Sequence, residues 1–139
     1  MNLVVDANIV LAAIIRNSTS RRLLLDLNLS LFAPEVLKGE VLRHIESDEE
    51  IQQKVNLSMA ELRDIFDLIC SRITFIQEEI YSEYEKESME VAPHKEDAPY
   101  IALALHLQCP LWSHDGGIAK QKLVEVVNTK QIVDGLTGV

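Results

Sequence analysis

Four acidic residues stand at positions where a folded chain can carry out chemistry. Asp6 and Asp115 each follow a short apolar run, Asp97 precedes an apolar helical segment, and Glu40 lies one turn into another. In open sheets of parallel strands, ligands bind at the edge where the carboxyl ends of the strands meet. We therefore expect the four carboxylates to converge in one crevice. Taken singly, each residue also has a structural interpretation as a turn, helix-cap or solvated helix residue.

Such a cluster needs positive charge to be stable. Carboxylates about 5 to 6 Å apart repel one another by roughly 3 kcal/mol per pair at an effective dielectric constant near 20. Bound cations, or protonation of some of the carboxyl groups, would relieve this repulsion. Carboxylate oxygens suit Mg²⁺ or Mn²⁺, and such an ion can activate water and hold the oxygens of a phosphodiester. The pattern thus favours metal-dependent cleavage of a phosphodiester bond.

Composition limits the ways in which the chain can bind nucleic acid. The 139 residues suit a single domain over 1–139, and the formal net charge is -9. An acidic chain does not hold nucleic acid by its overall charge, so binding requires metal ions or a local basic patch. Cys70 and Cys109 lack the spacing of a zinc site and are expected to be buried free thiols. No signal peptide or membrane-spanning segment is visible, which favours a cytoplasmic location.

Five short apolar runs alternate with helical segments and supply the expected strands. They are residues 3–5, 29–33, 73–76, 111–113 and 124–127. None alternates cleanly between polar and apolar residues, which is typical of parallel strands buried on both faces. The predicted fold is therefore α/β, a three-layer α/β/α sandwich with a five-stranded parallel sheet.

Several residues predict where the helices begin. Ser20 is expected to cap a second helix, and Pro34 to occupy the first turn of a third. Ser58 has the spacing of a capping box with Glu61. Thr129 is expected to cap a short terminal helix.

At these residues the chain resembles the PIN-domain family of endoribonucleases, in its VapC-like form. The resembling pieces are Val4-Val5-Asp6-Ala7-Asn8, Glu40, Glu96 to Ala104, and Leu111-Trp112-Ser113-His114-Asp115. The resemblance covers the whole chain and implies a sheet of order 3-2-1-4-5, one or two Mg²⁺ or Mn²⁺ ions, and RNA cleavage. Many small members of the family are dimeric toxins that an antitoxin inhibits.

The resemblance implies roles for individual residues. The metal-binding and catalytic acids would be Asp6, Glu40, Asp97 and Asp115, supported by Asn8 and by the Ser113 hydroxyl. Many members carry a further acid two residues after the fourth, but this chain has Gly117 there, which favours a single metal ion. His114 is expected to point away from the crevice, since side chains alternate along a strand.

Contacts to RNA would have to come from local basic residues. The candidates near the acids are Arg16, Lys38, Arg43, Lys95 and Lys120, and Arg21, Arg22 and Lys122 lie nearby. Most of them, taken singly, also fit an ordinary solvated surface. The expected partners are RNA, a second copy of the chain packed through the helix from Ser58 and the acidic stretch 78–90, and an antitoxin protein, with no membrane.

Other function classes fit less well. A phosphoacceptor signalling domain would need an aspartate at the end of the third strand, where Phe75-Ile76-Gln77 stands. A haloacid-type phosphatase would need an aspartate at position 8, which is Asn8. The remaining alternatives are a catalytically silent PIN-fold scaffold and an RNA-processing nuclease without an antitoxin.

Overall fold

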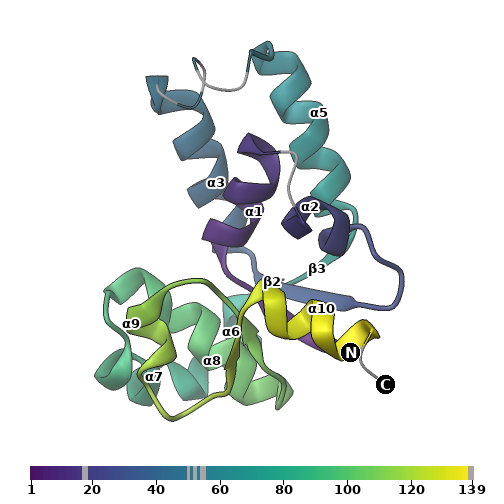
Figure 1. Cartoon of the computed structure of the whole chain (residues 1–139). Coiled ribbons are helices and arrows are strands. Elements are labelled where there is room, and N and C mark those ends of the chain that lie inside the picture. Colours follow the sequence, from purple (N-terminus) through teal and green to yellow (C-terminus); the bar gives the residue numbers. More distant parts are fainter. Residues whose placement is uncertain (17–18, 50, 52, 54–55, 138–139) are drawn as a thin grey trace.

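A five-stranded sheet runs through the middle of the molecule (Figure 1). The structure is a computed structural model, which describes residues 1–16, 19–49, 51, 53 and 56–137. The strands are β1 (Asn2–Val5), β2 (Ser30–Pro34), β3 (Ile73–Ile76), β4 (Leu111–Trp112) and β5 (Val126–Val127). All neighbouring strands are parallel, and their order is β3-β2-β1-β4-β5. The sheet expected from the sequence is confirmed in both direction and order.

Helices cover both faces of this sheet. One layer holds α1 (Ala7–Ile15), α2 (Thr19–Leu24), α3 (Val36–Ser47) and α5 (Met59–Cys70). The other is built on α8 (Ala98–Leu107), with α6 (Glu78–Tyr81), the 3₁₀ turn η1 (Ser82–Tyr84) and α7 (Glu85–Val91) packed against it. The remaining elements are the 3₁₀ turn η2 (Lys95–Asp97), α9 (Gly116–Ala119) and α10 (Thr129–Thr137), which contacts α2.

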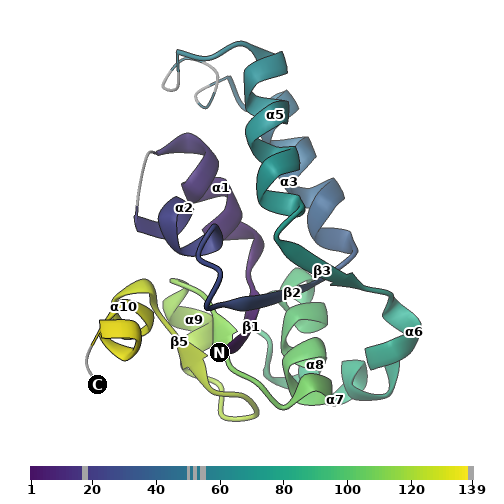
Figure 2. The same ribbon diagram turned by 90° about the vertical axis from the view of Figure 1, so that its right-hand side faces the viewer.

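The central strand is buried from both sides. Leu3, Val4 and Val5 of β1 are fully buried, because α1 lies over one face of the sheet and α8 contacts the other (Figure 2). This arrangement explains why the strands lack polar alternation. Among the described residues, no helix combines the length and the apolar character needed to cross a membrane.

The pairing of β1 with β4 brings two distant parts of the chain together. Val5 lies beside Trp112, and the Asp6 backbone N–H donates to the Trp112 carbonyl at 3.1 Å. The residues that follow both strands therefore meet at the carboxyl edge of the sheet.

Several strand boundaries differ from the expected ones by one or two residues: β2 begins at Ser30 and ends at Pro34, β4 ends at Trp112, and β5 begins at Val126. The fifth strand does not include Val124, because the Gln121 side chain binds that residue's backbone: its Oε1 accepts from Val124 N–H at 3.1 Å and its Nε2 donates to Val124 O at 2.8 Å. Pro34 ends β2 in register with Ile76 and is not in a helix. The next residue, Glu35, donates its backbone N–H to the Ile76 carbonyl at 3.1 Å, although its own backbone is already helical.

Two predicted helix caps are wrong. Ser20 lies inside α2 and is buried, with its hydroxyl 3.5 Å from the Thr129 hydroxyl. The cap of α10 is Asn128, whose Oδ1 accepts from Gln131 N–H at 2.9 Å while Gln131 Oε1 accepts from Asn128 N–H at 2.8 Å. The Thr129 hydroxyl is instead bonded to residues of other elements.

The acidic stretch 78–91 forms three short segments and not one helix. Glu79, Glu83 and Glu87 recur at intervals of four residues, a spacing at which like charges destabilise a continuous helix. Tyr81, at the first break, is turned inward and buried. By contrast, the capping box of Ser58 and Glu61 at the start of α5 is confirmed.

The two cysteines are free, as expected, but they are only half-buried. Cys70 is the last residue of α5, and Cys109 precedes β4 at the opposite edge from the carboxyl ends. Burial still raises the pKa of the Cys70 thiol to about 11.

Candidate active site

A cavity of about 410 Å³ opens at the carboxyl edge of the sheet, between the start of α1, α3 and the start of α8. Three of the four acids singled out in the sequence line it: Asp6, Glu40 and Asp97. Asn8 lines it as well. Asp115 does not line this cavity, although it is close enough to influence Asp6 electrostatically.

Asp6 is the most buried of these carboxylates, with 4% of its surface exposed. It directly follows β1 and occupies the N-cap position of α1. Its Oδ2 accepts a hydrogen bond of 2.7 Å from the Ser113 hydroxyl. Burial raises the pKa of Asp6, whereas the bond from Ser113 and the backbone of Asn8 lower it and the charge of Asp115 raises it.

Ser113 connects Asp6 to the fourth acid. Its hydroxyl donates to Asp6 and accepts from the Asp115 backbone N–H at 3.0 Å. The Asp115 side chain caps α9, where Oδ1 accepts from Gly117 N–H at 2.7 Å and from Ile118 N–H at 3.4 Å. One oxygen of Asp115 is thus occupied by a local structural role.

Asp97 stands immediately before α8, and its Oδ2 accepts from the His94 backbone N–H at 3.2 Å. Burial raises the pKa of Asp97, and the charges of Asp6 and Asp115 raise it further. The carboxylate is therefore held by the turn in front of α8 and is repelled by its acidic neighbours.

Glu40 reaches the cavity from α3. Burial raises its pKa, and so do the charges of Asp6 and Glu96, while the interactions with the Tyr100 hydroxyl and Arg43 lower it. Asp6 is thus electrostatically coupled to Glu40, Asp97 and Asp115 alike.

The four acids interact electrostatically, but their side chains do not form a set of direct metal ligands. In the described part of the chain, no three histidine, cysteine, aspartate or glutamate side chains are grouped so that they could hold a metal ion directly. The expected tight convergence is therefore not seen. Asp97 and Asp115 each bind a backbone N–H of their own turn, and Asp6 binds the distant Ser113 hydroxyl, so each carboxylate has a separate hydrogen-bond partner.

Sequence comparison identifies the family. A family model described as PIN domain matches residues 4–132. The chain belongs to the PIN-domain family. No curated protein sequence matches this PIN domain significantly.

Solved structures share the fold of this PIN domain. One is a chain of VapBC2 from Rickettsia felis bound to a DNA fragment from its promoter, with a TM-score of 0.67 and 15% identity over 92% of this chain and 98% of that one. Another is PAE2754 from Pyrobaculum aerophilum, with a TM-score of 0.71 and 14% identity over 100% of this chain and 91% of that one. At these identities the likeness concerns the fold.

The donor set of the PIN domain fits a hard divalent cation. Burial is the main cause of the raised pKa values of Asp6, Glu40 and Asp97, and the charges of acidic neighbours raise them further, so a bound cation would relieve both effects. Mg²⁺ keeps several water ligands and commonly binds through one or two carboxylates. A hydrated ion therefore suits an arrangement in which no three side chains meet.

Position 117 bears on the number of ions. A Cβ atom built on Gly117 would lie 3.1 Å from Asp115 Oδ1 and 3.2 Å from Pro93 Cγ. A side chain at position 117 would therefore require Asp115 or Pro93 to shift by a few tenths of an ångström.

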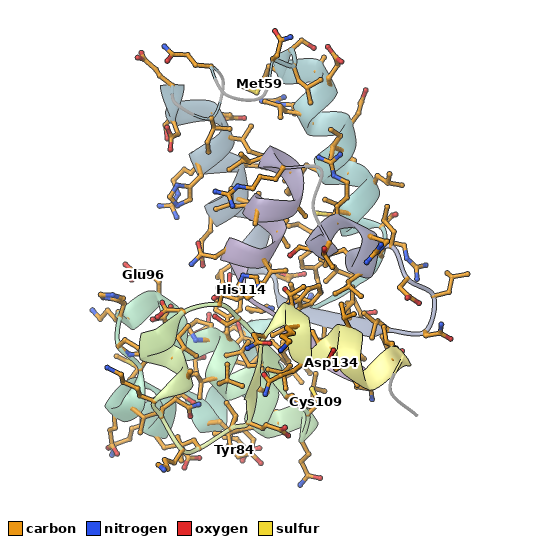
Figure 3. The ribbon with its side chains drawn as sticks, in the orientation of Figure 1. Met59, Tyr84, Glu96, Cys109, His114 and Asp134 are labelled. Carbon is orange, nitrogen blue, oxygen red and sulfur yellow. The ribbon has the colours of Figure 1, made fainter. Side chains whose placement is uncertain are left out.

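Glu96 and Tyr100 are among the cavity residues that were not identified as site residues from the sequence. Glu96 lies directly before Asp97 and faces the cavity, at the outer edge of the start of α8 (Figure 3). Tyr100 follows Asp97 by three residues, so both lie on one side of a helical turn, and this spacing was the available signal. The Tyr100 hydroxyl is buried without a well-formed hydrogen bond, and burial together with the charge of Glu40 raises its pKa.

The basic candidates lie in different surroundings. Arg43 lines the cavity, and its charge lowers the pKa of Glu40. Arg16 lines a neighbouring hollow that also contains Asn8. Lys38 lies over the Phe75 ring, with its Nζ 4.3 Å from the ring centre.

The other basic side chains divide between surface and structure. Lys95 and Lys120 are exposed. Arg21, in contrast, donates from Nε to the Ala13 carbonyl at 2.7 Å and from a terminal nitrogen to the Ile14 carbonyl at 3.0 Å. It thereby satisfies carbonyl groups at the end of α1.

Proposed function

We propose that this PIN domain is a metal-dependent endoribonuclease that cleaves RNA by hydrolysis. The observation that carries the proposal is the state of Asp6. This carboxylate is buried at a cavity, bonded to Ser113, and coupled by charge to Glu40, Asp97 and Asp115. An aspartate that only capped a helix would not require three acidic neighbours.

Asp6, Asp97 and Asp115 would hold a hydrated Mg²⁺ or Mn²⁺, with part of these contacts and that of Glu40 made through bound water. When bound, the ion supplies an activated water and neutralises charge on the phosphate. Ser113 orients Asp6 and the backbone of Asp115, and Asn8 lies on the cavity wall to orient bound water. Gly117 favours a single ion.

The basic residues would position the phosphates of the RNA. Arg43 is the strongest candidate, because it lines the same cavity as the acids. Arg16, Lys95 and Lys120 would extend the contact over the surrounding surface, and the packing of Lys38 on Phe75 makes its part smaller. Such contacts fix orientation and carry no sequence information.

A place in a toxin–antitoxin pair is the biological setting that we favour. The fold is shared with a chain of a VapBC2 complex, which supports an antitoxin partner. We further propose a homodimer and a cytoplasmic location, where RNA and Mg²⁺ are both available. A nuclease of RNA processing, or a silent PIN-fold scaffold, is the alternative.

Cleavage of single-stranded RNA by purified protein tests the proposal. We expect internal cuts with Mg²⁺ or Mn²⁺, none with EDTA, and none with Asp6→Asn purified in parallel. Cleavage that persists in both controls would show a contaminant or a different catalytic centre. A folded wild-type protein that binds RNA without cutting it would favour the scaffold.

A further inference from the structure

The Thr129 hydroxyl is bonded to three other elements of the chain. Thr129 is the first residue of α10, and its Oγ1 lies 3.1 Å from Trp112 Nε1, 2.5 Å from His114 Nε2 and 3.5 Å from Ser20 Oγ. These partners come from β4, from the turn after β4 and from α2. His114 lies beside the start of α10 in Figure 3.

The Thr129 hydroxyl joins Trp112 to His114. An indole N–H can only donate, so Trp112 donates to Thr129 Oγ1. The Thr129 backbone N–H donates to His114 Nε2 at 3.3 Å, so Nε2 is an acceptor and the ring proton is on Nδ1. The hydroxyl lies 2.5 Å from the same His114 nitrogen, and Ser20 Oγ, at 3.5 Å, is the most distant of its three partners.

Trp112 and His114 are separated by one residue, and that residue is Ser113. Side chains alternate along a strand, so the two that bind Thr129 face α10 while the Ser113 side chain faces the other way. On that other side the Ser113 hydroxyl binds Asp6 Oδ2 at 2.7 Å and the Asp115 N–H at 3.0 Å. Thr129 thus holds both neighbours of the residue that connects two acids.

A hydroxyl at position 129 is difficult to replace. Trp112 is fully buried, so removal of the Thr129 oxygen would leave its indole N–H without this acceptor. A valine matches threonine in shape but offers no acceptor, whereas a serine keeps the oxygen and loses only a methyl group.

We propose that Thr129 is a positioning residue of the active site, whose hydroxyl fixes Trp112 and His114 and thereby places the Ser113 hydroxyl between Asp6 and Asp115. This inference rests on the proposed function, because a position of Ser113 matters to activity only if the acids bind metal. It assigns α10 a part in the site although Thr129 does not line the cavity.

The test measures the Mg²⁺ or Mn²⁺ concentration that gives half of the full rise in melting temperature, with no need for catalysis. We expect Thr129→Val to raise this midpoint by roughly three- to tenfold, since loss of an outer-shell partner commonly weakens metal binding by about tenfold or more. Thr129→Ser should restore the wild-type midpoint. His114→Ala, at an exposed position, should shift it in the same direction and serves if Thr129→Val does not fold.

Two controls separate positioning from a general loss of stability. Ser58→Ala removes the cap of α5, and Ser20→Ala removes the longest contact of the Thr129 hydroxyl. Both should lower or keep the melting temperature without moving the metal midpoint. A wild-type midpoint in both Thr129→Val and His114→Ala would overturn the inference, as would a wild-type protein without any metal response. RNA cleavage by the wild-type protein, measured alongside, tests the proposed function separately.

Discussion

The Ser113 hydroxyl donates to Asp6 Oδ2 over 2.7 Å, across 107 positions of the sequence. Both residues are buried, and the bond crosses from the end of β4 to the end of β1. An aspartate buried in this way would tend to take up a proton, and the donated hydrogen bond opposes that tendency by stabilising the charged form. Ser113 therefore keeps Asp6 closer to the state in which it can bind a cation.

Ser113→Ala should weaken metal binding. Without the hydroxyl, the pKa of Asp6 rises further, because Ser113 is the largest of the influences that lower it. We expect the metal concentration at half-maximal stabilisation to increase by roughly tenfold, as for other outer-shell partners. Ser113→Thr keeps the hydroxyl and is the matched control. Equal metal midpoints for Ser113→Ala and the wild type would show that the bond has no part in binding.

Metal ions should stabilise the folded protein through the same carboxylates. At ten times its dissociation constant, an ion that binds only the folded state adds about 1.4 kcal/mol, or roughly 4 to 6 °C in melting temperature. Asp6→Asn combined with Asp97→Asn should abolish this rise and stabilise the metal-free protein, because two mutually repelling charges are gone.

The matched control for that double variant is Asp64→Asn with Asp67→Asn, which removes two charges from exposed positions of α5. It should keep the full metal response. A double variant at Asp6 and Asp97 that still responds to metal like the wild type would refute a shared site.

Much of this architecture could be predicted from the sequence, since short apolar runs without polar alternation require a parallel sheet with two covered faces. The placement of Asp6 and Glu40 at one edge followed from that topology. The separation of the carboxylates did not, because it depends on which backbone N–H each of them binds. His94 and Gly117 supply those donors through turns that no periodicity signals.

Two of the errors in the sequence-based boundaries arise from side-chain hydrogen bonds. At Val124 the nearby Gln121 side chain takes over the backbone bonds that a strand would make, and at Thr129 the hydroxyl contacts Trp112 and His114 while Asn128 caps α10. Gln121 and Asn128 are ordinary polar residues in the sequence, and only their position in the fold gives them these roles.

The metal-free protein should lose stability as the pH rises through the weakly acidic range. Asp6 and Asp97 have ordinary pKa values of 3.8 and Glu40 one of 4.5, and all three are raised in the folded protein, chiefly by burial. Between the ordinary and the raised values the folded state binds more protons than the unfolded state, so the free energy of unfolding falls with increasing pH. Above the raised values these groups add no further slope.

Urea unfolding in EDTA at several values between about pH 4 and pH 7 measures this dependence. Asp6→Asn should flatten the curve relative to the wild type. Asp64→Asn removes the same charge at an exposed position and should leave the slope nearly unchanged. Identical slopes for Asp6→Asn and the wild type would show that Asp6 does not titrate in this range.

Arg43 and Lys38 offer a matched pair for the path of the RNA, since both are exposed residues of α3. Arg43 lines the cavity beside Glu40, whereas Lys38 lies over Phe75. Arg43→Ala should weaken binding of a short single-stranded RNA by roughly threefold to tenfold at low salt. The slope of the binding constant against salt concentration, both as logarithms, should fall by the equivalent of about one phosphate contact. Lys38→Ala should change RNA binding by less than about twofold, because the contact that it removes is with Phe75 of the same protein and not with RNA. Fluorescence anisotropy in the Asp6→Asn background, which we expect to bind RNA without cutting it, measures both. Equal losses in the two variants would mean that the RNA contacts α3 without entering the cavity.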